Sequence, residues 1–344
     1  SGDQAYDLGR VVIENPLNQM WSSAVLELNP ETGDIVWEWH LWDHLVQDSN
    51  PDLPGYGIIF DHPELFDINC GPVGTHAGGP GVPNADWMHM NSIHYNANLD
   101  QIVLSSRIQN ELYIIDHSTT TEEAAGHTGG IYGKGGDFLY RWGNPQNYGR
   151  GTESDKILSA QHSVNWVSDD FIGAGNIVLF NNFHSANNSA VLEIVPPIDS
   201  DGNYIILDGS PYGPLDYTWS YNLESIIPMQ GGAFRNENGN TIITQTHLSK
   251  IQEIDYSGNI VWEYVYNSNG NGSSWIARAN TYPSSYLETG VDGDLNTDGI
   301  TNILDIVIAV NIVISGQNDS IADINDDGIV NILDIVQLVN LVIA

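Results

Sequence analysis

The chain has 344 residues, of which 44 are acidic and nine are basic, so its formal charge at neutral pH is −35. A field this negative repels phosphates and anionic lipids, which argues against nucleic acid and membrane surfaces as partners. The hydrophobic fraction of 41% is enough for a buried core and excludes a disordered acidic tail. No run approaches about 18 apolar residues, so no membrane-spanning helix is predicted.

The first recurring pattern is a pair of strands around a glycine turn, with tryptophan in the second strand. It is clearest at residues 24–39 and returns almost unchanged at 251–264. Two longer copies run from 112 to 142 and from 190 to 219. Alternating apolar and polar residues around a glycine are typical of an antiparallel hairpin. The recurring tryptophans are predicted to pack within the sheets: Trp37, Trp142, Trp219 and Trp262.

A second hairpin precedes three of these copies. Its outgoing strands are predicted at 101–107, 176–182 and 240–246, and incoming strands at 89–95 and 162–167. Two hairpins make a four-stranded unit of about 70 residues, which is the organisation of a β-propeller blade. The sequence therefore predicts an all-β propeller.

The predicted units do not complete a ring of larger order. Residues 1–20 supply no recognisable first hairpin, so the chain begins inside a blade. Either the ring is small, or a preceding part of the protein, in the same chain or as a separate fragment, completes it, and the pattern favours the second arrangement. We predict a propeller domain over residues 1–288 in which about four blades are present and the N-terminal blades are missing.

Residues 289–344 are predicted to form a small α-helical domain. The twelve-residue segment 294–305 recurs at 323–334, and apolar helical patterns follow at 306–314 and 335–343. Calcium prefers oxygen ligands, and a loop of this length supplies them from positions 1, 3, 5, 7, 9 and 12. Two bound Ca²⁺ ions are therefore predicted. The ligands would be Asp294, Asn296, Asp298, the Ile300 carbonyl, Asn302 and Asp305 in one loop, and Asp323, Asn325, Asp327, the Ile329 carbonyl, Asn331 and Asp334 in the other.

This duplicated tail, over nearly all of residues 292–344, resembles a type I dockerin domain. The resemblance implies calcium-dependent folding and docking to a cohesin domain. The positions that carry partner contacts hold the apolar pairs Ile303-Leu304 and Ile332-Leu333, where cellulosomal dockerins commonly have hydroxyl side chains. Two partners are left open: a cohesin-like domain, or self-association through the C-terminal helices. The helices could equally pack on each other or on the propeller.

Three residues are predicted to meet at one rim of the propeller. His89 begins an inner strand and Arg107 ends the strand that pairs with it, so the two should be neighbours. His162 holds the same strand-start position in the next blade. A histidine at a strand end is more often structural, but two aligned positions beside a rare arginine favour a site. A nucleophilic or acid–base imidazole next to a guanidinium is suited to anions with tetrahedral oxygens.

An ordered series of motifs resembles the aryl-sulfate sulfotransferase propeller family, over about residues 1–288. The motifs are Asp86–Ile93, Gln101–Arg107, Gly129–Gly136, Tyr140–Gln146 and Gln161-His162. The resemblance implies a bacterial, exported, six-bladed propeller that moves a sulfuryl group from an aryl sulfate to a phenol without a nucleotide donor. It further implies that His162 becomes sulfohistidine, and that His89 and Arg107 hold the sulfate oxygens and assist the phenolic oxygen. The family's further active-site histidine, from an earlier blade, has no counterpart before His40.

Two functions are left open. The first is an exported aryl-sulfate sulfotransferase with ping-pong kinetics, located outside the cell or at its surface, with an export signal that is not in this chain. The second is a non-catalytic propeller that serves as an extracellular structural or adhesion subunit and assembles through its calcium-binding tail. A preceding segment that brings a further histidine to the channel would favour the first.

Overall fold

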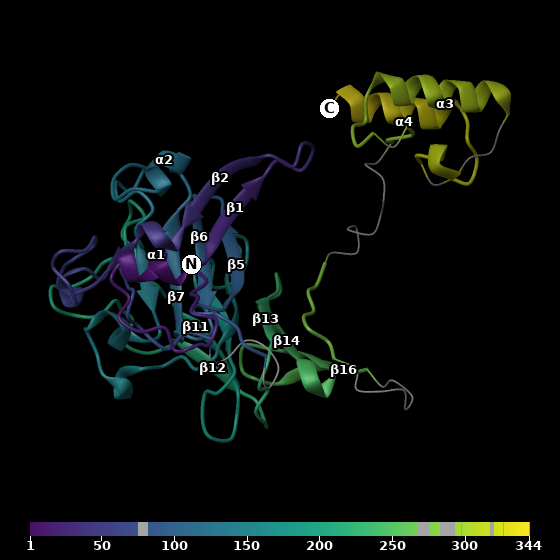
Figure 1. The fold of residues 1–344 in the computed structure, drawn as a ribbon. Helices are drawn as coiled ribbons and strands as arrows, with labels where there is room; N and C mark the ends of the chain where they lie inside the picture. The colour runs from purple at the N-terminus through teal and green to yellow at the C-terminus, as the bar shows by residue number, and fades with distance from the viewer. Residues whose placement is uncertain are drawn as a thin grey trace. The chain divides into compact units, whose positions relative to one another are not determined.

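The computed structural model divides the chain into two compact units, residues 1–280 and 281–344 (Figure 1). The predicted boundary between residues 288 and 289 lies outside the described residues. None of the helices in the described part of the chain has the length and apolar character needed to cross a bilayer. The structure describes residues 1–74, 82–266, 275–282, 293–296, 298–316, 320–325 and 327–343.

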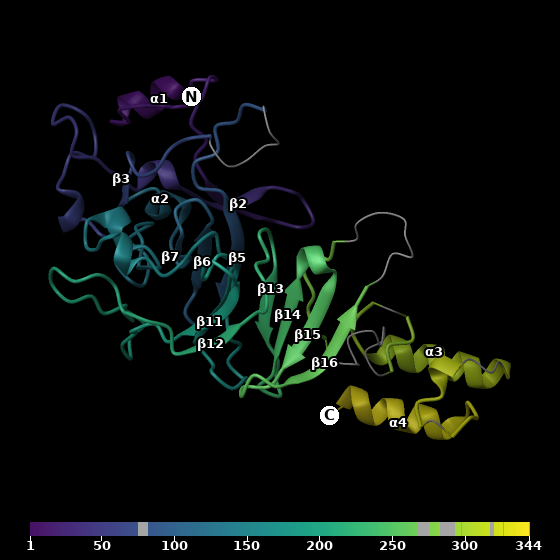
Figure 2. The ribbon, with the colours of Figure 1, turned by 90° about the horizontal axis from the view of Figure 1, so that it is seen from below.

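Unit 1 contains three antiparallel sheets of four strands each. The first sheet consists of β5 (Met90–Asn96), β6 (Gln101–Ser106), β7 (Glu111–Asp116) and β8 (Tyr140–Trp142). The second consists of β9 (His162–Trp166), β10 (Ile177–Asn181), β11 (Ala190–Ile194) and β12 (Trp219–Asn222). The third consists of β13 (Gly232–Arg235), β14 (Thr241–Gln245), β15 (Lys250–Ile254) and β16 (Ile260–Val265). Strands adjacent in each sheet are consecutive in sequence, as Figure 2 shows for β13 to β16. The predicted double hairpins are confirmed.

The N-terminal part of unit 1 is less regular. Residues 1–23 contain the helix α1 (Gly2–Asp7) and no named strand, and β1 (Ala24–Leu28) pairs with β2 (Ile35–His40) as an isolated hairpin (Figure 1). The short strands β3 (Leu45–Val46) and β4 (Phe66–Asp67) pair in parallel. One-turn elements fill the connections: η1 (Leu41–Asp43), η2 (Ile59–Asp61), α2 (Thr121–Ala124), η3 (Pro145–Tyr148), η4 (Glu153–Asp155) and η5 (Thr246–Leu248).

Burial differs sharply between the middle and the edge of the sheets. Every residue of β6, β7, β10 and β11 is buried, because middle strands are covered on both faces. Every residue of β16, the last strand of the third sheet, is exposed, whereas β8, the last strand of the first sheet, is buried throughout. The predicted tryptophan packing is therefore correct for Trp37 and Trp142, which are buried, and wrong for Trp262, which is 48% exposed.

Unit 2 contains two helices that lie side by side, α3 (Ile303–Ser315) and α4 (Ile332–Ile343), and the turn η7 (Ser320–Ala322) (Figure 2). Both helices begin three residues before the predicted apolar pattern. The side chain of Asn302 accepts a hydrogen bond from the backbone N–H of Leu304 and caps α3. Asn331 does the same for Leu333 at the start of α4. Asparagine is among the preferred residues at this position.

A fully buried ion pair joins the first sheet to the N-terminal part of unit 1. Arg141 of β8 donates two hydrogen bonds, of 2.7 and 2.8 Å, to the two carboxylate oxygens of Glu111 of β7. Its remaining amino group donates to the Leu65 carbonyl at 2.8 Å, and its guanidinium lies over the ring of Tyr148. Burial disfavours the charge, but the neighbouring Glu111 carboxylate raises the pKa of Arg141. The Arg141 guanidinium therefore keeps its charge inside the core.

We predict that Glu111→Gln destabilises unit 1 by about 3–5 kcal/mol, because it leaves a buried guanidinium without its counter-charge. The measurement is the free energy of unfolding in urea. Glu153→Gln, which removes the partner of Lys156 in an exposed pair, is the matched control and should change little. Equal effects of the two substitutions would contradict the prediction.

Candidate active site

His162, the first residue of β9, is held through one of its two ring nitrogens. Its Nδ1 lies 2.7 Å from Oδ1 of Asn182 and 3.0 Å from the carbonyl oxygen of Ala160. Both oxygens are acceptors, so Nδ1 carries the proton and Nε2 carries the lone pair of the neutral ring. The Asn182 amide cannot turn around, because its Nδ2 donates to the carbonyls of Ile227 and Gln230. The arrangement leaves Nε2 as the nucleophilic atom.

The surroundings of His162 also keep the ring neutral. Burial lowers its pKa most, since only 9% of the residue is exposed. The hydrogen bond to Asn182 works in the opposite direction, and the positive charges of Arg107 and His89 lower the pKa further. The net pKa lies below the ordinary histidine value. A neutral imidazole is the form that can attack an electrophile.

His89 and Arg107 are neighbours, as predicted. His89 immediately precedes β5 and Arg107 immediately follows β6, and the backbone N–H of Arg107 donates to the carbonyl of His89 at 3.1 Å. Nδ1 of His89 lies 2.5 Å from a carboxylate oxygen of Asp86, whose other oxygen accepts from the His89 backbone N–H. The carboxylate thus fixes Nδ1–H and leaves Nε2 of His89 for proton transfer.

Arg107 supplies a partly desolvated positive charge at this rim. Burial lowers its pKa and the Asp86 carboxylate raises it, but a guanidinium remains protonated in either case. With nine basic residues among 344, such a cation stands out against the acidic surface. A fixed guanidinium can hold two oxygens of a sulfate or phosphate group at once.

Gln161 joins the second sheet to the first and so brings the three residues together. Its Nε2 donates to the carbonyls of Ser106 (2.9 Å) and Glu111 (3.0 Å), and its own carbonyl accepts from Nδ2 of Asn91 (2.7 Å). Since Ser106 precedes Arg107 and Gln161 precedes His162, this contact places the two strand ends at one rim. The charges of Arg107 and His89 both act on the His162 ring.

The backbone is unusual at the same positions. His89, Ala160 and Ser163 have φ angles of 48°, 53° and 56°, in the left-handed region that non-glycine residues rarely occupy. The pairing registers of β5 with β6 and of β9 with β10 are also irregular. Strained residues and bulges cluster where a side chain must be aimed at a ligand. The strain thus falls on the two strand starts that carry the candidate histidines.

Three contributing residues were not predicted as part of the site: Asp86, Gln161 and Asn182. Asp86 and Gln161 belong to the motifs that carry the family resemblance, and the spacing of Asp86 three residues before His89 is a local signal for a turn that fixes both. Asn182 occupies the strand-end position that Arg107 holds in the preceding sheet. Its position in the strand alone does not reveal that its side-chain oxygen accepts a hydrogen bond from the His162 ring.

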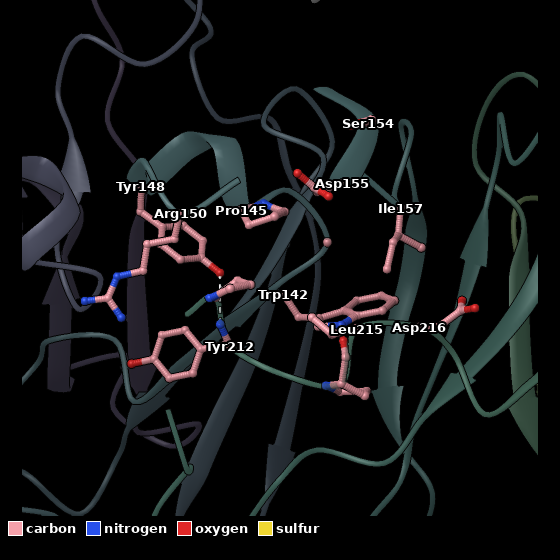
Figure 3. Close-up of a pocket in the computed structure, with 13 residues that line it drawn as sticks. Trp142, Pro145, Tyr148, Arg150, Ser154, Asp155, Ile157, Tyr212, Leu215 and Asp216 are labelled. Atoms are coloured by element: carbon pink, nitrogen blue, oxygen red, sulfur yellow. Dashed lines mark hydrogen bonds between the residues drawn. The ribbon is translucent and has the colours of Figure 1, made fainter. Parts of the chain in front are cut away.

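Two of the cavities in the described part of unit 1 bear on the candidate site. One, of about 510 Å³, is bounded by β8, η3 and the 211–216 segment, and none of the three candidate residues lines it (Figure 3). Its Trp142 is almost fully buried and donates to the Pro214 carbonyl, which fits a packing role. A second cavity, of about 330 Å³, is bounded by 90–93 at the start of β5 and by residues of the β1–β2 hairpin.

In the two loops predicted to bind calcium, the carboxylate at position 12 accepts hydrogen bonds from backbone N–H groups of the same loop. Burial opposes ionisation of Asp305, but hydrogen bonds from the backbone N–H groups of Asn302, Asn296 and Leu295 lower its pKa. Asp334 accepts from two backbone N–H groups in the same way. The glycine at position 6 has a φ of 85° in the first loop and 84° in the second.

The donor set of both loops suits a hard cation. Asp305 and Asp334 are fully buried and Asp294 nearly so, yet no lysine, arginine or histidine follows Arg278 in the sequence. Buried carboxylates need a positive partner, and a ring of carboxylate and carbonyl oxygens is what Ca²⁺ prefers. The side-chain oxygens of the position-9 asparagines cap the helices.

We predict that His162 titrates below the ordinary histidine value of about 6.5 and carries its proton on Nδ1 when neutral. Nitrogen-15 NMR of the imidazole, assigned with His162→Asn, measures both properties. Asn182→Ala should lower the pKa further, because it removes an acceptor that favours the protonated ring. A pKa at or above 6.5, or an Nε2–H tautomer, would contradict this assignment.

Comparison with known proteins adds a family. The family model of the arylsulfotransferases (ASST) matches residues 13–194. No curated protein matches the chain. Among solved structures, a protein of unknown function from Bacteroides caccae is 13% identical, with a TM-score of 0.34 and coverage of 72% of this chain and 55% of that one. Hydrazine synthase from Kuenenia stuttgartiensis is 10% identical, with a TM-score of 0.30 and coverage of 57% and 39%.

A virginiamycin B lyase from Staphylococcus aureus is 15% identical, with a TM-score of 0.26 and coverage of 53% and 57%. The chain thus spans less than two thirds of each of these structures. The family match covers more than half of the chain and includes His89, Arg107 and His162. The chain belongs to the arylsulfotransferase family.

Proposed function

We propose that this protein transfers a sulfuryl group from an aryl sulfate to a phenolic acceptor through a covalent intermediate on Nε2 of His162. The observation that carries the proposal is a neutral imidazole with a free Nε2 at the same rim as a guanidinium. Membership of the family supports a role in sulfuryl transfer in general. An apolar cavity is lined by Met90, the residue that follows His89, and offers an aryl ring a surface at the start of β5.

In the first half-reaction, the lone pair of His162 Nε2 attacks the sulfur of the donor. The new N–S bond forms as the bond between sulfur and the aryl oxygen breaks, and the phenolate takes a proton from Nε2 of a protonated His89. The His162 ring gains positive charge in this step. Its Nδ1–H, donating to Asn182 and to the Ala160 carbonyl, disperses that charge.

In the second half-reaction, His89 accepts the proton of the acceptor phenol. The resulting oxygen nucleophile attacks the sulfur, the N–S bond breaks, and His162 returns to its neutral form. Arg107 holds the sulfuryl oxygens in both steps and stabilises their charge in the transition state. The two half-reactions balance without a nucleotide or a redox partner. Because a covalent intermediate separates them, they require ping-pong kinetics.

We predict that the native full-length protein transfers sulfate from p-nitrophenyl sulfate to phenol, measured by release of p-nitrophenolate. His162→Asn should lower kcat/KM by about a thousandfold or more, and Arg107→Gln by about a hundredfold. Because the pKa of His162 is lowered, kcat/KM should fall on the acid side only below the ordinary histidine pKa. His62→Ala, which removes a partly exposed histidine paired with Glu64, should leave kcat/KM unchanged.

The covalent step has its own measurement. Labelled sulfate should remain on the wild-type protein after donor is added without acceptor, and mass spectrometry should locate it on His162. If the native protein leaves the donor intact although His162→Asn binds it normally, the enzyme proposal fails. The alternative of a structural or adhesion subunit then takes its place.

We also propose that the sheets of unit 1 are blades of a propeller completed by further strands. Support comes from β1 and β2, which form a sheet of two strands beside sheets of four, and from the exposed strand β16. Exposed strand edges pair readily with other strands. The remaining blades of the same propeller are the partner that this edge suits.

For unit 2 we propose two Ca²⁺ ions, one in each twelve-residue loop. This proposal is supported by the buried carboxylates Asp305 and Asp334, for which the sequence after Arg278 offers no basic partner. The glycine turns in both loops support it as well. Loops of this class with extracellular roles bind calcium in about the 10⁻⁴–10⁻³ M range, which fits a location outside the cell. The exposed pairs Ile303-Leu304 and Ile332-Leu333 support docking, either to a cohesin-like domain or to a second copy.

We predict that chelation of calcium lowers the helical circular dichroism signal and that added Ca²⁺ restores it. Asp305→Asn combined with Asp334→Asn should abolish this response, because each substitution removes the buried carboxylate of position 12. Asp52→Asn, at an exposed position of unit 1, is the control. A helical signal that is indifferent to chelator would rule the calcium proposal out. Calcium-dependent dimers would favour self-association over a cohesin-like partner.

A further inference from the structure

Two histidines and an aspartate outside the catalytic group bring three metal-binding atoms together in unit 1. His44 lies between η1 and β3, His127 follows α2, and Asp137 precedes β8. The Nδ1 atoms of both histidines lie 2.8 Å from the same carboxylate oxygen of Asp137. All three ligand atoms lie within 4.8 Å of one another. Nothing in the proposed sulfuryl transfer uses these residues.

The hydrogen-bond partners of His44 require a positive charge between its ring and the Asp137 carboxylate. Nε2 of His44 lies 2.8 Å from the carbonyl oxygen of Ala124, which only accepts, so Nε2 carries a proton. If the His44 ring is neutral, its Nδ1 carries a lone pair. That lone pair faces the Asp137 carboxylate oxygen at 2.8 Å, so two hydrogen-bond acceptors oppose each other. A cation must lie between them. The ring and the carboxylate are buried, so water does not supply the compensation.

His44 is also held in the manner typical of a metal ligand. Histidine ligands usually donate their second ring N–H to a carbonyl or carboxylate, as His44 does to Ala124. The ring stacks on Trp39 with an angle of 1° between the planes. Gly136 leaves the room that the ring needs, because a Cβ there would lie 2.5 Å from Nε2 of His44. The orientation of Nδ1 is therefore set before any ion binds.

The donor atoms decide which cation fits. A proton would make His44 a hydrogen-bond donor to Asp137 and leave His127 with an ordinary hydrogen bond, whereas a metal ion binds donor atoms of all three residues at once. Two imidazole nitrogens and one carboxylate oxygen suit Zn²⁺ and related transition metals, while Ca²⁺ and Mg²⁺ prefer oxygen alone. The His127 side chain is 59% exposed, which leaves an approach for the ion and a fourth position for water.

We propose that His44, His127 and Asp137 bind one divalent transition-metal ion of the zinc type. The ion links the β7–β8 connection, which carries His127 and Asp137, to the segment that follows β2. These segments are more than 80 residues apart in the sequence at their closest ligand pair, His44 and His127. The site is a structural clasp of unit 1, and it does not depend on the sulfuryl-transfer proposal.

The test uses the native full chain, stripped of metal and then titrated with Zn²⁺ or Co²⁺, with calcium present throughout so that the unit 2 loops do not compete. We expect one zinc per chain by elemental analysis, visible absorption of a low-coordinate Co²⁺ site, and a rise in Tm of about 5 °C at saturating Zn²⁺. His127→Ala is the main variant because that side chain is exposed, and Asp137→Asn is isosteric. His117→Ala removes a histidine that faces two carboxylates but no second histidine.

Loss of zinc, of the cobalt spectrum and of the Tm shift in both variants, with all three retained in His117→Ala, supports the site. Zinc binding that persists undiminished in His127→Ala and Asp137→Asn overturns it. So does a wild-type protein that binds neither metal: the cation between His44 and Asp137 is then a proton.

Discussion

The ion pair between Glu111 and Arg141 is the contact on which the arrangement of unit 1 depends. It holds β7 against β8 and, through the Leu65 carbonyl, fastens the irregular N-terminal part to the first sheet. Two buried charges give up hydration, so this arrangement persists only because nearly every polar atom around it has a partner. Asn147 and Tyr113 complete the coordination of the carboxylate.

The backbone of Glu111 also connects this ion pair to the candidate site. The Glu111 carbonyl accepts from Gln161, which stands directly before His162, while Ser106 accepts from the same amide directly before Arg107. The buried Gln161 side chain thus positions both Arg107 and His162. Asp86 fixes the tautomer of His89, and Asn182 fixes that of His162. The proposed sulfuryl transfer would require little movement at this rim, because the side chains are already oriented in the structure.

The sequence predicted the repeated elements well and the supporting contacts poorly. Hairpins such as 251–264 have strong local signals, and strand ends bring His89 beside Arg107 through antiparallel geometry alone. The exposure of Trp262 was not predictable from its repeat, because burial depends on whether a further layer covers β16. The roles of Gln161, Asn182 and the His44 cluster depend on contacts between residues far apart in the chain. No local spacing encodes those contacts.

The Gln161 contact also bears on how this fold can change over time. Repeat proteins commonly gain or lose whole units, since each unit contacts only its neighbours. Here His162 belongs to one sheet, while His89 and Arg107 belong to the preceding one. A unit inserted or deleted at that junction would separate His162 from His89 and Arg107, whereas the same event elsewhere in unit 1 would leave them adjacent. Under the proposed propeller arrangement, a change in the number of units is therefore least tolerable between the first and second four-stranded sheets.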